Sequence, residues 1–185
     1  IPSDLTFVNE NFDTVNFLQA IDKPTVIVPV YYQCPGLCSP LLEGVAEVIG
    51  SASIELGKDY QVFTVSFNPV EKTRLAREKK ENYVKLVKRD ADFENGWKFY
   101  TGDSMNISRL LNSVGYKIKK EGKEFIHPGA IIVVSPAVEI PMAASVYIGL
   151  ALTSHDAAIS TAAEYSNVAT SGNVNAISDG ASGFA

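Results

Sequence analysis

Two β-rich runs with a helical pattern between them constrain the fold of this chain more than any other feature. Residues 24–32 are almost all β-branched, aromatic or proline, which is typical of a strand buried on both faces. Apolar residues then recur every three or four positions over 41–52, and this spacing predicts a helix from Ser39 to about Leu56. Residues 60–67 alternate in polarity and predict a second strand. A β-α-β unit implies parallel strands, so the chain belongs to the α/β class.

Further helices and strands are predicted around this unit. They are an edge hairpin or irregular lead-in over 1–20, an amphipathic helix over 70–89 whose Lys and Arg residues face water, a strand over 97–101, a helix over 104–114 capped at Asp103, a hairpin of 116–120 with 124–126, and a buried strand over 130–134. Pro29 cannot donate a ladder hydrogen bond, which predicts a bulge or an edge within the first run. The whole pattern indicates an α/β sandwich with a mixed central sheet flanked by helices.

Composition excludes some classes of function. A net charge of -5 over 185 residues gives no broad basic surface for nucleic acid or for an anionic membrane. No apolar run reaches the roughly 18 to 20 residues that span a bilayer, so the chain as given is expected to be soluble. Because it begins at Ile1 and not at Met, we expect that a signal or membrane anchor upstream has been trimmed.

The last part of the chain differs in composition, since no Lys or Arg occurs after Lys123 and small and polar residues dominate. We expect one domain over 1–165, with a last strand near 146–152 and a last helix over 155–165. Residues 166–185 are rich in Gly, Ser and Asn and predict a flexible tail.

The loop between the first strand and its helix contains both cysteines, Cys34 and Cys38. So short a loop makes a disulfide a poor structural staple, because it constrains the unfolded chain little. The alternatives are thiol-disulfide exchange, binding of a soft metal, and a role as small apolar fillers. A helix N-terminus is expected to lower the pKa of Cys38, which favours either of the first two roles. Peroxide reduction by one activated cysteine is disfavoured, because no Thr stands three residues before Cys34 and no Arg is clearly matched.

Spacing and ligand supply favour copper over the other chemistries. Dithiol oxidoreductases of the thioredoxin kind use C-x-x-C, whereas the longer C-x-x-x-C lets two thiolates face a shared ion, although redox exchange stays open. Zinc prefers four ligands, and the chain offers only Cys34, Cys38, His127 and His155 as soft or borderline candidates. Two thiolates with one imidazole suit Cu(I) and tolerate Cu(II). His127, in a loop before a strand, is the stronger third candidate, while His155 at a predicted helix start is expected on the surface.

Four motifs resemble the Sco/SenC family of copper-binding proteins that assist assembly of the binuclear copper site in cytochrome c oxidase. The motifs are Tyr-Tyr-Gln-Cys-Pro-Gly-Leu-Cys at 31–38, Thr-Val-Ser-Phe-Asn-Pro-Val-Glu at 64–71, Gly-Trp-Lys-Phe-Tyr-Thr-Gly at 96–102, and Phe-Ile-His-Pro-Gly-Ala-Ile-Ile-Val-Val-Ser-Pro at 125–136. The resemblance implies a thioredoxin-like fold with an added N-terminal hairpin, and it implies that Cys34, Cys38 and His127 bind one copper ion.

The same resemblance implies a copper chaperone rather than an enzyme. The expected partners are an upstream copper donor and the copper-bearing subunit of the oxidase, and the expected location is the exported, periplasmic or cell-envelope side of a bacterial membrane. The alternative is a thiol-disulfide reductase in which Cys34 and Cys38 act on the cysteines of that subunit. Two departures from the family are Asn68, where the family usually has Asp, and residues 137–165, which are atypical.

Overall fold

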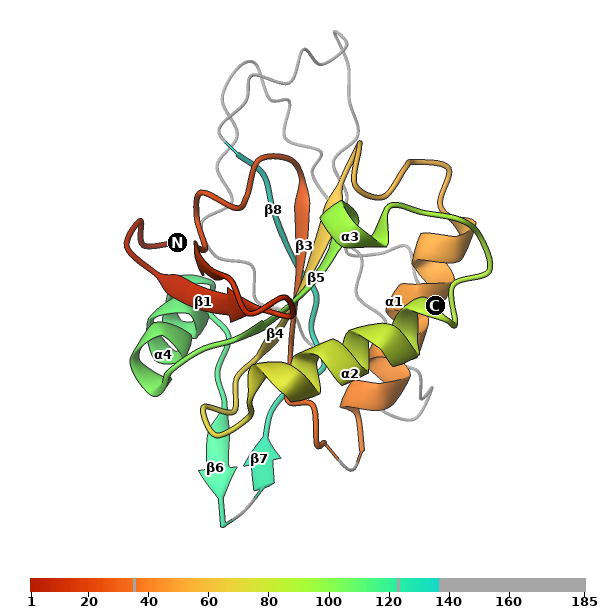
Figure 1. Ribbon diagram of the computed structural model, residues 1–185. Coiled ribbons are helices and arrows are strands. Elements are labelled where there is room, and N and C mark those ends of the chain that lie inside the picture. The colour runs from red at the N-terminus through yellow and green to blue at the C-terminus, as the bar shows by residue number, and fades with distance from the viewer. Residues whose placement is uncertain (35, 123, 137–185) are drawn as a thin grey trace, which may run out of the picture. The chain divides into compact units, whose positions relative to one another are not determined.

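A mixed six-stranded sheet forms the centre of the computed structural model, which describes residues 1–34, 36–122 and 124–136. The strand order is β2-β1-β5-β4-β3-β8, and a separate two-stranded ribbon pairs β6 with β7 (Figure 1). The strands are β1 (Thr6–Asn9), β2 (Thr14–Asn16), β3 (Thr25–Val30), β4 (Gln61–Ser66), β5 (Trp97–Thr101), β6 (Lys119–Glu121), β7 (Glu124–Ile126) and β8 (Ile132–Val134). The helices are α1 (Cys38–Ser51), α2 (Thr73–Val84), α3 (Phe93–Gly96) and α4 (Ser104–Ser113). The predicted α/β class with a mixed sheet is confirmed.

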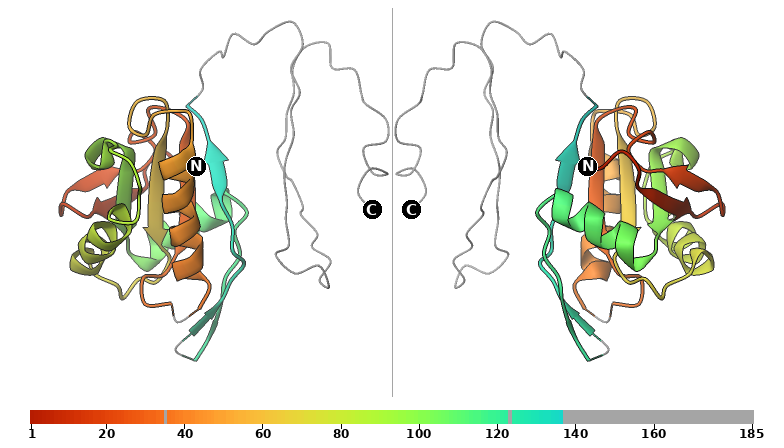
Figure 2. Two further views of the ribbon diagram at one scale, coloured as in Figure 1. Left: turned by 90° about the vertical axis from the view of Figure 1, so that its right-hand side faces the viewer. Right: turned by 90° about the vertical axis from the view of Figure 1, so that its left-hand side faces the viewer.

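Three parallel strands, β3, β4 and β5, make the centre of this sheet. The crossover from β3 to β4 contains α1, and the crossover from β4 to β5 contains α2, so these two helices lie side by side on one face. The third long helix, α4, lies on the opposite face from α1 (Figure 2). The carboxyl ends of β3 and β4 therefore meet at one edge of the sheet, where both strands lead into loops.

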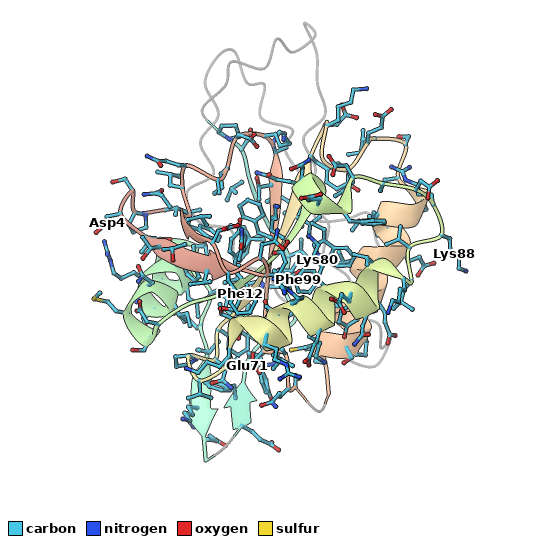
Figure 3. All side chains as sticks on the ribbon, in the orientation of Figure 1. Asp4, Phe12, Glu71, Lys80, Lys88 and Phe99 are labelled. Carbon is cyan, nitrogen blue, oxygen red and sulfur yellow. The ribbon has the colours of Figure 1, made fainter. Side chains whose placement is uncertain are left out.

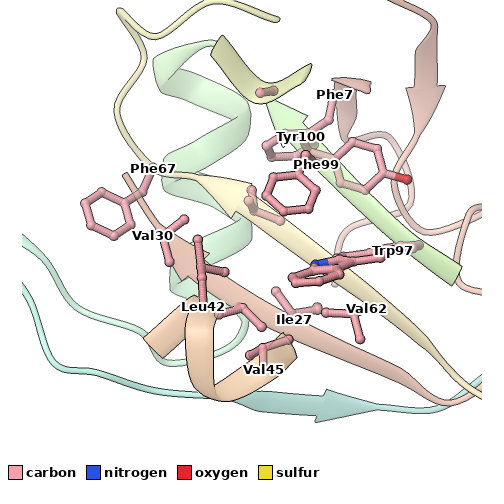
Figure 4. Close-up of a cluster of buried hydrophobic side chains, with 14 of the residues drawn as sticks. Phe7, Ile27, Val30, Leu42, Val45, Val62, Phe67, Trp97, Phe99 and Tyr100 are labelled. Atoms are coloured by element: carbon pink, nitrogen blue, oxygen red, sulfur yellow. The ribbon is translucent and has the colours of Figure 1, made fainter. Parts of the chain in front are cut away.

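Buried apolar side chains fill the space between the sheet and its helices. Leu42 and Val45 of α1 lie over the central strands, with Trp97 and Phe99 of β5 nearby (Figure 4). Trp97 is fully buried, and its indole Nε1 donates a hydrogen bond to Thr64 Oγ1 at 2.9 Å, so its one polar atom is satisfied inside the core.

Pro29 is accommodated because pairing with β8 stops before it. The carbonyl groups of Pro24 and Val30 accept hydrogen bonds from the N–H groups of Gln61, the first residue of β4, and Phe67, directly after β4. Alternate residues of β3 therefore face β4 and the others face β8. Pro29 belongs to the set that faces β8, but the register there ends where Ile27 meets Ile132. Pro29 therefore lies beyond the last residue pair of β3 with β8, where no strand hydrogen bond requires a backbone N–H group.

Four predictions of local structure need correction. The strand at the end of the described chain is not buried: β8 is an edge strand, and Val133 is 71% exposed. The first helix starts at Cys38, not Ser39, and ends at Ser51, not near Leu56. After its end, Ala52 is extended, and the Arg89 side chain donates hydrogen bonds to Ala52 O and Ile54 O. The second helix is shorter than predicted, and not all of its basic residues face water, since Lys80 pairs with the buried Glu10 at 2.6 Å (Figure 3).

The N-terminal hairpin and the hairpin of β6 with β7 are as predicted, although both are shorter than their sequence patterns. The last strand and helix predicted within 137–165, the tail over 166–185, and His155 lie outside the described residues. In the described part of the chain, no helix has the length and apolar content that a bilayer span requires.

Candidate metal centre

The cysteine loop joins the end of β3 to the start of α1. Cys34 lies in this loop and is partly exposed, while Cys38 is the first residue of α1 and only 3% exposed. A backbone hydrogen bond from Cys34 N to Tyr31 O, at 3.1 Å, turns the chain back as soon as the strand ends. The two thiols are free of any disulfide.

A buried carboxylate holds the residues that lead into this loop. Glu71, 5% exposed, comes from the segment after β4 and accepts hydrogen bonds from the backbone N–H groups of Tyr32 at 2.8 Å and Gln33 at 2.9 Å. The hydroxyl of Ser66 donates a third bond to the same carboxylate at 2.5 Å. Glu71, labelled in Figure 3, therefore joins the end of β4 to the two residues that directly precede Cys34.

His127 reaches the same place from the segment between β7 and β8. Its ring packs edge-on against Tyr31 and Phe67, with ring centroids 5.8 and 5.0 Å away. On the Nδ1 side, the hydroxyl of Tyr116 lies 3.3 Å away and donates to Pro128 O at 2.7 Å, and that carbonyl is itself 3.0 Å from Nδ1. Both groups can accept a hydrogen bond from Nδ1–H, which leaves the Nε2 lone pair directed toward the cysteines.

The sulfur atoms of Cys34 and Cys38 and the nearest ring nitrogen of His127 all lie within 4.8 Å of one another. The distance from Cys38 Sγ to His127 Nε2 is 3.7 Å, although the two residues are 89 positions apart in sequence. Ligands that bind one soft ion at about 2.0 to 2.3 Å stand roughly 4 Å apart, so small side-chain movements would let all three reach it. Among the described residues, this is the only group of at least three His, Cys, Asp or Glu side chains so placed.

The two thiols differ in pKa, and the prediction for Cys38 was wrong. Burial raises the pKa of Cys38, and the neighbouring Cys34 and Glu71 act in the same direction. Burial also opposes ionisation of Cys34, but hydrogen bonds from the backbone N–H groups of Cys38 and Gly36 outweigh it and lower its pKa. The physical reason is the direction of the helix N–H groups, which point out of the helix toward the preceding loop and so stabilise a thiolate at Cys34.

Solved structures of other proteins share the fold of this chain. A protein of Aquifex aeolicus VF5 assigned to electron transfer matches at 25% identity over 73% of this chain and 76% of its own, with a TM-score of 0.62. Arabidopsis thaliana ScoI with copper bound matches at 19% identity over 71% and 78% of the two chains, TM-score 0.55. A SCO1/SenC family lipoprotein of Bacillus anthracis matches at 19% identity over 71% and 77%, TM-score 0.56. The chain has the Sco fold.

Sco structures with copper bound include those of Arabidopsis thaliana, Bradyrhizobium japonicum and yeast, and the predicted thioredoxin-like, Sco-type fold is confirmed. No family model and no curated protein sequence matches this chain.

The structure brings together the three residues predicted as ligands, Cys34, Cys38 and His127. It also shows two residues that the sequence interpretation did not single out, Glu71 and Tyr116. Glu71 is the last residue of the motif quoted over 64–71, and its place in that motif was the available signal. Its burial could not be inferred from its neighbours, since Val70 beside it is 68% exposed. Tyr116 gave no signal, because a tyrosine after a helix-ending glycine is equally typical of the core.

Proposed function

We propose that this chain is a copper-binding protein of the Sco/SenC family that delivers its ion to the binuclear copper site of cytochrome c oxidase. The observation that carries the proposal is the convergence of Cys34, Cys38 and His127 within 4.8 Å. Two thiolates and one imidazole form a soft donor set that suits Cu(I) and tolerates Cu(II). Known proteins of the same fold bind copper, and one of them is described as a member of the Sco family of cytochrome c oxidase assembly proteins.

A set of three ligands also suits transfer of the ion. The chain's own residues would hold copper firmly enough to carry it, yet leave one position for a ligand of the acceptor. The acceptor is then the copper-bearing oxidase subunit, and an upstream donor supplies the ion. An exported location on the cell-envelope side, with an anchor outside the given chain, fits such a partner.

Copper titration of the reduced protein tests the ligand set. The native chain is expected to bind one ion, with Cu(II) giving a thiolate-to-copper charge-transfer absorption, and His127→Ala is expected to lose most of the affinity. His155→Ala is the matched control, since it removes the only other histidine and is expected to titrate like the native chain. Full affinity in His127→Ala would contradict the assignment.

The two thiols also support a second function, thiol-disulfide reduction of the acceptor's cysteines. A partly exposed Cys34 with a lowered pKa beside a buried Cys38 with a raised pKa is the arrangement of an attacking and a resolving thiol. Exchange with a model disulfide is expected to persist in His127→Ala and to stop in Cys34→Ser. Loss of exchange in His127→Ala would show that the histidine serves both activities.

A further inference from the structure

Glu71 is a buried charge whose hydrogen-bond partners are all neutral. Its carboxylate accepts from two backbone N–H groups and one hydroxyl, and no Lys or Arg in the described part of the chain forms an ion pair with it. Among the described residues the other buried carboxylate is Glu10, which is paired with Lys80 at 2.6 Å. Burying an unpaired charge is costly, so at Glu71 the hydrogen bonds alone offset the loss of water.

The position of this charge is as informative as its burial. The N–H groups that bind Glu71 belong to Tyr32 and Gln33, the two residues directly before Cys34. Glu71 therefore lies against the loop that contains both proposed thiolate ligands. A site meant only to stabilise thiolates would have a positive neighbour, and here the neighbour is negative.

We propose that Glu71 is a positioning residue that fixes the cysteine loop and, through its uncompensated charge, biases the site toward Cu(II). The inference rests on the proposed function. Two thiolates with Cu(I) carry a net charge of minus one, whereas with Cu(II) they are neutral. A fixed negative charge nearby therefore disfavours the Cu(I) form, and the low polarizability of a buried site strengthens the effect.

Glu71→Gln tests the charge, because it removes one unit of charge with little change in shape. The Cu(I) and Cu(II) dissociation constants are measured separately by competition with chelators. The ratio of Cu(II) to Cu(I) affinity is expected to fall by about tenfold, because the two copper forms differ by one unit of charge and the nearby carboxylate acts on that difference at an effective dielectric constant of about 20. Where Glu71→Gln fails to fold, Glu71→Met removes the same charge with a flexible apolar side chain of similar length.

Ser66→Ala is the matched control, since it removes one hydrogen bond to Glu71 but leaves the charge. Ser66→Ala is expected to weaken the Cu(I) and Cu(II) affinities equally and to leave their ratio unchanged. If the role of Glu71 were purely structural, Glu71→Gln would give the same result. An unchanged ratio in Glu71→Gln, or equal changes of the ratio in both variants, would overturn the proposed bias.

The copper-free protein provides an independent measurement of positioning. The amide protons of Tyr32 and Gln33 are expected to exchange slowly in the native chain and at least tenfold faster in Glu71→Gln. The two N–H groups bind different carboxylate oxygens, and in Gln one of these oxygens is replaced by an NH2 group, which cannot accept. Unchanged exchange would overturn the positioning role. If the native chain binds neither Cu(I) nor Cu(II), the proposed function and the bias both fail, while the exchange rates still decide whether Glu71 holds the loop.

Discussion

At the scale of single residues, the two thiols of the cysteine loop have opposite environments. Cys34 is partly exposed, and its sulfur accepts hydrogen bonds from backbone N–H groups, whereas Cys38 is buried near Cys34 and Glu71. In the reduced, metal-free protein, iodoacetamide is therefore expected to alkylate Cys34 at least about tenfold faster than Cys38 near pH 7. Because the pKa of Cys34 is lowered, its rate should reach its plateau at a lower pH than that of a free thiol.

Tandem mass spectrometry of the peptide that contains both cysteines measures the order of alkylation. In Cys34→Ser the remaining thiol is expected to stay slow, since burial of Cys38 does not depend on Cys34 alone. Faster labelling of Cys38 than of Cys34 in the native chain would contradict the assignment of the two environments.

Tyr116 acts on the site through His127. Its hydroxyl bridges Nδ1 of His127 and Pro128 O, so Tyr116→Phe frees the ring on the side away from the cysteines. Loss of such an outer hydrogen bond typically lowers metal affinity by about 10- to 100-fold, and we expect the lower end because Pro128 O still accepts from Nδ1. Tyr60→Phe is the control: among the described residues its buried hydroxyl has no partner, so copper titration should give the native affinity.

At the scale of elements, α4 depends on its N-cap. The side chain of Asp103 accepts from Met105 N at 2.8 Å and Asn106 N at 2.9 Å. Asp103→Ala is expected to lower the free energy of unfolding by about 1 kcal/mol in urea denaturation, whereas Asp103→Asn keeps an equally good cap. Equal losses of unfolding free energy in Asp103→Ala and Asp103→Asn would show that the capping hydrogen bonds do not stabilise α4.

The same cap predicts a dependence on pH. Hydrogen bonds from Asn106 lower the pKa of Asp103 in the folded state, so its contribution is complete above the unfolded value of about 3.9 and is lost as pH falls through the lower folded value. Asp103→Asn lacks this loss, and its stability relative to the native chain should rise on acidification. The contribution is small because the carboxyl is almost fully exposed to water.

At the scale of the whole molecule, copper would join segments that are distant in sequence. The ligand residues belong to the loop after β3, the start of α1 and the segment before β8, so a bound ion would link the β3–α1 connection to the segment between β7 and β8. At a free copper concentration of 100 times the dissociation constant, the native state gains about 2.7 kcal/mol. The melting temperature of the reduced protein is expected to rise accordingly, and His127→Ala should show little of this rise.

The sequence by itself determined the elements and the place of the cysteines. The spacing of apolar residues follows the side-chain repeat of a helix or a strand, and turns and caps depend on residues adjacent in sequence. The β-α-β unit, both hairpins and the Asp103 cap could therefore be predicted. Cys34 and Cys38 could be placed after a buried strand for the same reason. Exposure of β8 could not be predicted, because it depends on β8 having a neighbour on one side only.

The tertiary structure alone decided which side chains meet around the cysteines. His127 comes near because β8 runs antiparallel beside β3 and stops pairing before Pro29, a consequence of strand order that local patterns do not contain. Glu71 meets the loop because β3 and β4 end at the same edge of the sheet. The pKa of Cys38 is raised rather than lowered because burial, which is set by packing, outweighs the helix N-terminus that the sequence made visible.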